Sequence, residues 1–484
     1  MAPSSEEPKM RIIKDPIQPH FQQLRHIKQL GTTYRVYPGA SHNRFEQCLC
    51  VAHLARSIAT HLKTSQPELH ITARDVECVQ IAGPCHDLDH GPWSHVWDGL
   101  FIAVVAPPAE DEKPWQHEDA FKMMFVDLIR FLKEHSLVPE DQFPEKDVRF
   151  ILALIDGEET HCDPDEKSFL FDIVANKRNG LDVDPFDYIA RDTYMMGIPS
   201  KVPSLRIIQS ARVIDGKICF DVKNVNLLLN IGASRFGLHK EQYNHKTAKV
   251  IEYMIVDALK LAETSLQIAG RIKSPKTFMY LTDNIEQEIK ASTAAELKPA
   301  RDLLDAIDIR NLYKQVDERG EHRGLHGRRV GHRGYVDPAL RPGDEPADKV
   351  NFYSKQNPTT QTEIIYTESA RAQRGDYPTL MPQYFAELTL SVFTKLPQYM
   401  LFHRNDAMLT IYRTLHADTK RVRNRTASLG SFDGSSINSV PVSYAPDTPG
   451  GNPMSLSKNS QKRSRESLED IGKETSRVAK MQAK

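Results

Sequence analysis

The sequence predicts a mainly α-helical protein with a small mixed α/β region near the C-terminus and a disordered tail. From about residue 11 to residue 270, most of the chain has apolar side chains that recur at helical spacing. Alternation typical of a strand is confined to short pieces such as EIIYT at 363–367. Residues 426–484 are rich in Ser, Pro, Gly and Asn, a composition that cannot bury a core.

The first helices can be placed from their ends. Residues 43–62 are apolar at Phe45, Leu49 and further positions with helical spacing. A capping box of Thr72 and Asp75 predicts the start of the next helix, and we expect Gly83-Pro84 to end it. The pattern then predicts, in order, a loop at 103–116, helices over 117–175 and 184–196, a hairpin at 213–222 around Asp215-Gly216, and helices from 224 to 268.

The predicted domain organisation follows from these elements. An Arg- and Gly-rich stretch at 316–335 has the composition of a flexible linker. We therefore predict the following regions: a disordered N-terminus at 1–10, a helical domain with an extension at 11–315, a linker at 316–349, a small mixed region at 350–425, and the tail at 426–484.

Composition excludes a global attraction to nucleic acid or membrane. The chain of 484 residues has 63 basic and 64 acidic residues and a net charge of −1. No apolar run approaches the ~20 residues that cross a bilayer, and the first ten residues have no apolar core, so we expect neither membrane span nor secretory signal. The six cysteines lack C-x-x-C spacing, which indicates reduced thiols and a nuclear or cytoplasmic protein.

One stretch carries an unusual density of chemical groups. Residues 85–98, CHDLDHGPWSHVWD, contain three His and three Asp. Adjacent His86 and Asp87 at a helix end can both be metal ligands, but two ligands do not hold a catalytic ion. From these residues alone, the stretch is either part of a metal site or a polar turn between two helices.

Two predicted helix faces carry further polar groups. Asp184, Tyr188 and Asp192 recur at every fourth position. Arg235, His239, Tyr243 and Lys246 follow at spacings of four, four and three. A face of this kind indicates a bound anion, and the alternative is a structural ion-pair network.

Ordered motifs give the chain a family resemblance. SHNRFE, CHDL-x-HGP-x-SH, NKRNG-x-DVD and LH-x-x-x-Y-x-HK resemble HD-domain phosphohydrolases, and in particular the SAM and HD domain-containing deoxynucleoside triphosphate triphosphohydrolases. The resemblance covers roughly residues 11–400 and implies a mainly helical HD fold. A SAM domain is not expected, because only ten residues precede the first matching motif.

The resemblance implies a reaction and its residues. A transition metal (zinc, iron or manganese) lies beneath the triphosphate, Mg²⁺ accompanies the triphosphate, and a dNTP gives deoxynucleoside and inorganic triphosphate. By position, the metal ligands are His86, Asp87, Asp184 and Gln47. Phosphate binding and proton transfer fall to Arg44, His90, His95 and His117, with Asp98 supporting the histidines. Sugar and base contacts match Gln29, Leu30, Tyr188, Asp192, Arg235, His239, Tyr243 and Asn244.

The chain departs from the family's pattern within this set. Gln47 stands where the family has a histidine ligand, and we expect the weaker amide donor to lower the affinity for a transition metal. Asp89 replaces a glycine and Pro84 a leucine beside the His-Asp pair. Pro185 stands where the family keeps a phosphate-binding lysine.

The resemblance also implies sites for activating GTP or dNTP and a dimer or tetramer. The matching positions are Lys14, Gln22, Arg25, Arg206 and Lys223. A family segment near the N-terminus is missing, Lys14 replaces an asparagine, and Asp221 and Leu227 replace an arginine and an asparagine. We therefore expect altered activation by nucleotides.

A second functional hypothesis remains beside dNTP hydrolysis. The chain is then a catalytically weakened homologue that binds nucleotide or single-stranded nucleic acid, or that joins active relatives in mixed oligomers. Basic stretches at 316–335 and 420–425 favour phosphate contacts, although such stretches are usually solvated loops. A P-loop nucleotidase is excluded, because no GxxxxGK[ST] occurs.

Overall fold

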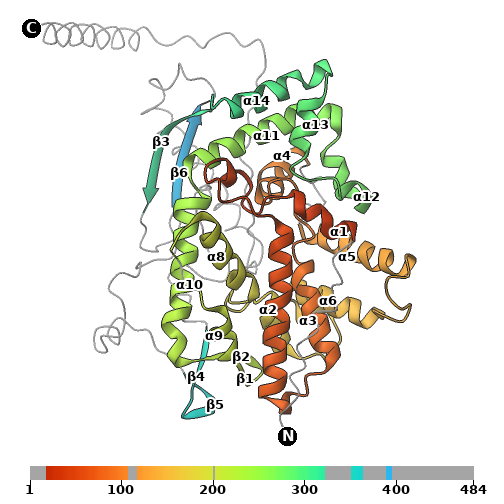
Figure 1. The fold of residues 1–484 in the computed structure, drawn as a ribbon, viewed down its shortest axis with the longest axis vertical. Coiled ribbons are helices and arrows are strands. Elements are labelled where there is room, and N and C mark those ends of the chain that lie inside the picture. The colour runs from red at the N-terminus through yellow and green to blue at the C-terminus, as the bar shows by residue number, and fades with distance from the viewer. Residues whose placement is uncertain (1–17, 107–116, 200–201, 322–349, 363–387, 395–484) are drawn as a thin grey trace, which may run out of the picture. The chain divides into compact units, whose positions relative to one another are not determined.

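The structure, a computed structural model, describes residues 18–106, 117–199, 202–321, 350–362 and 388–394. The described part is mainly helical, as predicted. Helix α2 (Arg44–Ser65) packs against α3 (Ala73–Cys85) and α8 (Val183–Met196), which lie on its two sides (Figure 1). Two helices, α3 and α8, therefore pack along α2, and each of the three helices contributes one end to the candidate site.

The remaining helices cover this centre. Helix α6 packs on α3, α10 on α8, and α11 on α14. Their bounds are α1 (Pro19–Gln22), α4 (Ala103–Val105), α5 (His117–Glu134), α6 (Glu145–Asp156), α7 (Phe171–Val174), α9 (Ser204–Gln209), α10 (Val225–Leu238), α11 (Lys246–Leu266), α12 (Pro275–Phe278), α13 (Ile285–Ala291) and α14 (Lys298–Asp308). The predicted loop at 103–116 therefore begins with the short α4, and 107–116 lies outside the described residues.

Helix α3 begins as predicted and ends later than predicted. The capping box of Thr72 and Asp75 is present in both directions. The helix continues through Pro84 to Cys85, so Gly83-Pro84 does not end it. Gly83 instead allows close packing, because a Cβ there would lie 3.2 Å from the carbonyl oxygen of Val51 in α2.

The hairpin expected at 213–222 is confirmed and belongs to a larger sheet. Strands β1 (Arg212–Ile214) and β2 (Lys217–Asp221) pair antiparallel around Asp215 and Gly216, which both have positive φ as a type I′ turn requires. Strand β4 (Asn351–Ser354) adds parallel to β2, and β5 (Asn357–Thr362) antiparallel to β4. The start of the predicted C-terminal region therefore shares a sheet with the helical domain.

A second pair of strands includes the residues at the start of the predicted linker. Strand β3 (Lys314–Glu321) pairs antiparallel with β6 (Leu388–Thr394). Residues 314–321, which overlap the start of the predicted linker at 316–349, therefore form a strand, because backbone pairing with a distant strand overrides a Gly- and Arg-rich composition. The remaining linker, the EIIYT piece, and the predicted disordered segments at 1–10 and 426–484 lie outside the described residues.

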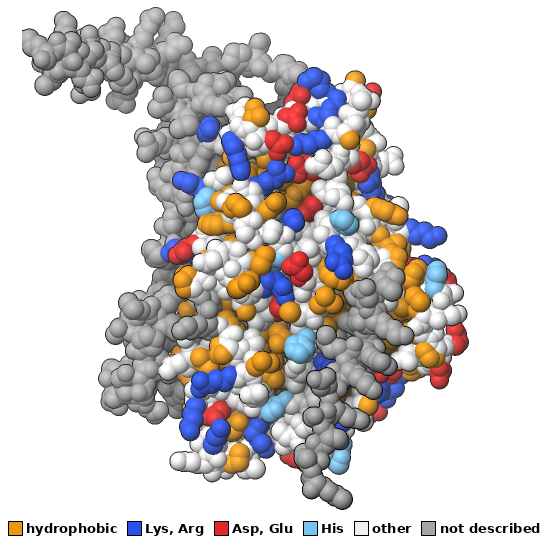
Figure 2. Space-filling model, viewed as in Figure 1, with side chains coloured by type: hydrophobic (Ala, Val, Ile, Leu, Met, Phe, Trp, Pro, Cys, Tyr) orange, Lys and Arg blue, Asp and Glu red, His pale blue; other side chains and the backbone are white. Residues whose placement is uncertain are grey.

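The surface and the cysteines agree with the composition. All six cysteines are free. No helix of the described part is long and apolar enough to cross a membrane. Basic and acidic side chains lie together at the end of the molecule where α13 and α14 are found (Figure 2), and Lys290 there pairs with Glu286 and Asp308.

Candidate functional site

The predicted metal ligands converge from three helix ends. Gln47 lies in the first turn of α2, and His86 and Asp87 follow the last residue of α3. Asp184 lies in the first turn of α8, where Asp182 caps the helix by accepting the backbone N–H of Asp184. The structure thus brings together four residues that lie up to 137 positions apart in the sequence.

His86 is oriented as a ligand would be. Its Nδ1 donates to the carbonyl oxygen of Gly83 in the preceding turn, which leaves Nε2 facing the site. Nε2 lies 3.3 Å from Oδ1 of Asp87 and 3.6 Å from Oδ1 of Asp184, and has no hydrogen-bond partner. Burial alone would lower the pKa of His86, but the two carboxylates raise it to about 10, so a cation and a proton compete for this nitrogen.

Gln47 presents its amide nitrogen, rather than its oxygen, to the site. The amide nitrogen donates to Oδ1 of Asp184, and the amide oxygen accepts from Nη1 of Arg44 at 3.0 Å. Rotating the amide by 180° would set its N–H groups against the guanidinium and its oxygen against a carboxylate. The two charged neighbours therefore hold Gln47 in the orientation that opposes metal coordination.

Arg44 and Asp87 form a buried pair behind the ligands. Nη1 of Arg44 lies 3.2 Å from both oxygens of Asp87, and the two residues are 5% and 2% exposed. Burial would raise the pKa of Asp87, but Arg44 and the neighbouring histidines hold it well below its usual range. Asp87 is thus a permanent anion in the site.

These observations decide how well the site fits a divalent cation. Its donors are an imidazole nitrogen that makes no hydrogen bond and the two carboxylates that it faces, all of them ordinary ligands of such ions. The fourth position does not fit, since Gln47 donates where a ligand must accept. In the described residues, no set of three or more His, Cys, Asp or Glu side chains is already arranged to hold a metal.

We expect weak and pH-dependent metal binding as a result. Purified protein should contain well below one equivalent of iron or zinc after dialysis at neutral pH. Because His86 must lose a proton to bind, the apparent affinity should rise about tenfold per pH unit below the pKa of His86. Elemental analysis after dialysis at two pH values measures both effects, and a full equivalent at neutral pH would contradict the assignment of Gln47 as a weak point.

The predicted acid–base groups lie next to the ligands. Nε2 of His90 is 3.1 Å from Oδ1 of Asp87, and the rings of His90 and His95 pack edge to face at 5.3 Å. Desolvation lowers the pKa of His95, against the charge of Asp98, which lies in a π-helix at Trp97–Ile102. His117 is the first residue of α5, and its side chain lies outside the described part.

The backbone between the two histidines is strained. Trp93 and Ser94 have φ of 55° and 54°, values that cost roughly 1–2 kcal/mol for each residue with a side chain. Ser94 accepts a hydrogen bond from Nε of Arg44 at 3.1 Å and donates to the carbonyl oxygen of Lys28 at 3.0 Å. Such strain persists only where neighbours hold it, and it concentrates at functional sites.

The predicted sugar contacts form a second cluster. Asp192 is 1% exposed and has a partner on each oxygen, His42 at 2.7 Å and the hydroxyl of Tyr243. Tyr188, on the same face of α8, is partly buried, and desolvation raises its pKa. His42 belongs to the SHNRFE motif, and the sequence offered no signal that it pairs with Asp192.

The predicted ladder of four residues is only partly correct. Arg235 lies in α10, but the helix widens into a π-helix at His239–Tyr243, so the spacing of four no longer keeps one face. Lys246 begins the next helix, α11, and is exposed. Asn244 bonds the carbonyl oxygen of His239 at 2.8 Å, and His239 stacks edge to face on Tyr243. Both π-helices of the described part therefore border the candidate site.

The other predicted residues lie at the margins. Gln29 is 5% exposed with an unbonded side-chain oxygen, and Leu30 is next to it. Asp89, the residue in place of a family glycine, is buried, and Pro185 occupies the first turn of α8, where its missing N–H is tolerated. Of the predicted regulatory residues, Arg25 bonds Gln22, Arg206 bonds Asn224 beside Lys223, and Lys14 lies outside the described part.

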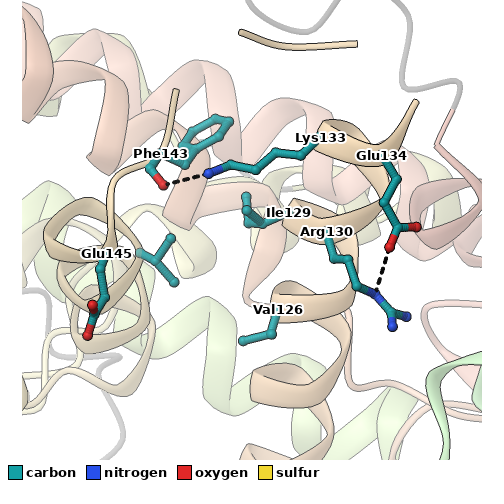
Figure 3. Close-up of a pocket in the computed structure, with 8 residues that line it drawn as sticks. Val126, Ile129, Arg130, Lys133, Glu134, Phe143 and Glu145 are labelled. Atoms are coloured by element: carbon teal, nitrogen blue, oxygen red, sulfur yellow. Dashed lines mark hydrogen bonds and ion pairs between the residues drawn. The ribbon is translucent and has the colours of Figure 1, made fainter. Parts of the chain in front are cut away.

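A groove of about 430 Å³ between α5 and the start of α6 is separate from this site. Figure 3 shows apolar Val126, Ile129 and Phe143 in its lining, with the amine of Lys133 directed to the carbonyl oxygen of Phe143 and Arg130 directed to Glu134. Its lining residues are Val126, Ile129, Arg130, Lys133, Glu134, Phe143, Glu145 and Val148, none of which is a predicted site residue.

Known proteins resemble this chain over most of its length, although no family model matches it. It is 38% identical over 430 residues to deoxynucleoside triphosphate triphosphohydrolase SAMHD1 of Gallus gallus, covering 78% of this chain and 68% of that protein. Identity to SAMHD1 of Homo sapiens is 37% over 458 residues, with 80% and 70% covered. The putative HD domain-containing protein L394 of Acanthamoeba polyphaga mimivirus is 30% identical over 339 residues, with 63% and 69% covered.

Proposed function

This chain belongs to the SAMHD1 family of deoxynucleoside triphosphate triphosphohydrolases, and we propose that it hydrolyses dNTPs at the site described above. The observation that carries the proposal is the unbonded Nε2 of His86, which faces Asp87 and Asp184 at a junction of three helices. The alternative of a purely binding homologue is not favoured, since the carboxylates and the pair of histidines remain assembled.

Family membership implies a divalent metal, and the chain has residues to hold it. We assign His86, Asp87 and Asp184 as ligands, with Gln47 able to contribute only after its amide turns away from Arg44. The bound ion supplies positive charge that stabilises the charge developing on the phosphoryl oxygens. A transition metal suits the imidazole, and Mg²⁺ suits the free phosphate oxygens of the nucleotide.

The chain's own side chains provide the remaining chemistry. Arg44 holds Asp87 and offers the rest of its guanidinium to phosphate oxygens. Water attack on the α-phosphorus breaks the bond to the 5′ oxygen, which must receive a proton. His95 and His90 lie within reach of one another and can move that proton, and Asp98 favours the protonated form of His95. The products are a deoxynucleoside and intact triphosphate.

The sugar cluster gives the site its substrate class. Asp192 is held on both oxygens, so it is oriented before a 3′-hydroxyl arrives. Tyr188 lies one helical turn away on the same face, and we assign to it the steric exclusion of a 2′-hydroxyl. The site therefore prefers deoxyribonucleotides over ribonucleotides, because it excludes the 2′ oxygen of the ribose.

This selectivity can be measured directly. We expect hydrolysis of dGTP to exceed that of GTP by about a hundredfold, and Tyr188→Ala to reduce the ratio about tenfold by opening the space beside the sugar. The matched control is Tyr194→Ala on the same helix, since Tyr194 is 83% exposed and should leave the ratio unchanged. A ratio that Tyr188→Ala does not alter would contradict the role of Tyr188.

A further inference from the structure

Asp283 lies outside the site and has no role in the chemistry above. It is in the turn between α12 and α13, in the LTDNI stretch. Its two carboxylate oxygens accept hydrogen bonds from two different parts of the backbone. Oδ1 accepts the N–H of Trp93 at 2.7 Å, and Oδ2 accepts the N–H of Lys28 at 2.8 Å. These partners are 190 and 255 residues away in the sequence.

The Lys28 side of this bridge leads to the nucleoside contacts. The backbone N–H of Asp283 also donates to the carbonyl oxygen of His26 at 3.1 Å, so residue 283 holds the 26–28 segment through both main chain and side chain. Gln29 and Leu30, the predicted base and sugar contacts, follow Lys28 directly. Any shift of Lys28 therefore moves both of them.

The Trp93 side leads to the groups around the phosphates. Trp93 is the first of the two strained residues and lies between His90 and His95. Its N–H bond to Asp283 is one of the contacts that hold the left-handed backbone in place. The next residue, Ser94, bonds Arg44, so this backbone conformation also sets the position of the guanidinium.

The two segments are fitted closely to each other. Ser94 donates to the carbonyl oxygen of Lys28, and a Cβ on Gly31 would lie 2.7 Å from the carbonyl oxygen of Trp93. Asp283 comes from a third element and bonds the backbone of both segments. Burial raises its pKa to about 7 in spite of these two bonds and the charge of Lys28, so the folded protein keeps this carboxylate at an energetic cost.

We propose that Asp283 is a positioning residue for catalysis, which sets the nucleoside-binding segment 26–31 and the strained segment 91–96 at the separation that the reaction needs. The expected effect of Asp283 on the reaction rests on the proposed function. The structural coupling of the two segments by Asp283 does not depend on that function.

The test is Asp283→Asn, a change of nearly equal volume. The asparagine oxygen can accept one of the two N–H groups, but its NH₂ group faces the other, so one bond is lost. We expect kcat for dGTP to fall at least tenfold while KM changes less than threefold, because the nucleotide still binds but its sugar and phosphates are no longer correctly aligned. The rate is expressed per binding site, and the sites are counted by calorimetry with a non-hydrolysable dGTP analogue. Unfolded protein therefore does not lower the measured kcat.

The matched control is Asp172→Asn. Asp172 is a buried carboxylate in α7 that accepts the N–H of Ile218 at 3.2 Å and pairs with Arg178, so neither of its partners lies in 26–31 or 91–96. It should lose stability without changing kcat per site. An equal loss of kcat in both variants, or an unchanged kcat in Asp283→Asn, would overturn the proposal.

Amide hydrogen exchange separates this inference from the proposed function. In Asp283→Asn, exchange should rise at least tenfold at both 26–31 and 91–96, and in Asp172→Asn at neither. If the parent protein and its Gln47→His variant both fail to hydrolyse any dNTP, the proposed function is rejected. The exchange pattern still tests whether Asp283 couples the two segments. Faster exchange confined to the turn around 283 would refute it.

Discussion

Gln47→His should raise dNTP hydrolysis by about a hundredfold, equivalent to about 2.7 kcal/mol of transition-state stabilisation. The imidazole replaces an amide whose nitrogen now donates to Asp184 and whose oxygen is bound by Arg44. It adds a nitrogen ligand and frees Arg44 to bind phosphate. Turnover of each dNTP and metal content should be measured on the same samples, since both are expected to rise.

Controls separate coordination from other effects of the new side chain. Gln80→His adds an imidazole on α3 beside Arg56, away from the site, and should change neither quantity. Asp89→Gly removes a buried charge without rebuilding coordination, so its gain should be smaller, and the double variant with Gln47→His should exceed either single change. If Gln47→His raises metal content and leaves hydrolysis unchanged, the main lesion lies elsewhere, with Pro185 the first candidate.

Asp184→Asn should lower dNTP hydrolysis by about a thousandfold and leave the fold intact. It removes a charged ligand opposite His86. The expected loss corresponds to the transition-state stabilisation that a single charged group typically contributes in such a site. The Asp184 side chain is 30% exposed, so water can solvate what remains.

Asp87→Asn should cause a similar loss of activity together with a loss of stability. Arg44 is 5% exposed and would remain buried without its anion, at a cost of about 3–5 kcal/mol. Thermal unfolding and residual metal content distinguish the two variants, because both should lose metal but only Asp87→Asn should unfold at a clearly lower temperature. Retention of activity in Asp184→Asn would remove Asp184 from the ligand set.

Much of the fold and site could be predicted from the sequence, because the relevant signals are local. The capping box at Thr72 and Asp75 fixed the start of α3, and the turn at Asp215-Gly216 fixed the hairpin. His86, Asp87 and Asp184 lie in recognisable sequence motifs, and the structure places them at neighbouring helix ends. Gly83 does not mark the end of α3 as expected, because a glycine is needed there for close packing against α2.

The remaining features depend on pairing between distant segments or on irregular helix geometry, which local sequence patterns do not encode. Strand β3 exists because β6 pairs with it from more than sixty residues away, which composition does not reveal. The π-helix at His239–Tyr243 breaks the expected ladder, since sequence spacing presumes a regular helix. Sequence patterns carry no signal for the roles of His42 and Asp283, because their partners, Asp192, Lys28 and Trp93, lie on other elements.

The central claim is that this site cleaves the bond between the 5′ oxygen and the α-phosphorus of a dNTP. Chromatography of the products from purified protein, with each dNTP and added divalent metal, tests it most directly. We predict deoxynucleoside and inorganic triphosphate in equal amounts, with the yield raised by Gln47→His. Deoxynucleoside monophosphate with pyrophosphate, or no product from either protein, would contradict the claim.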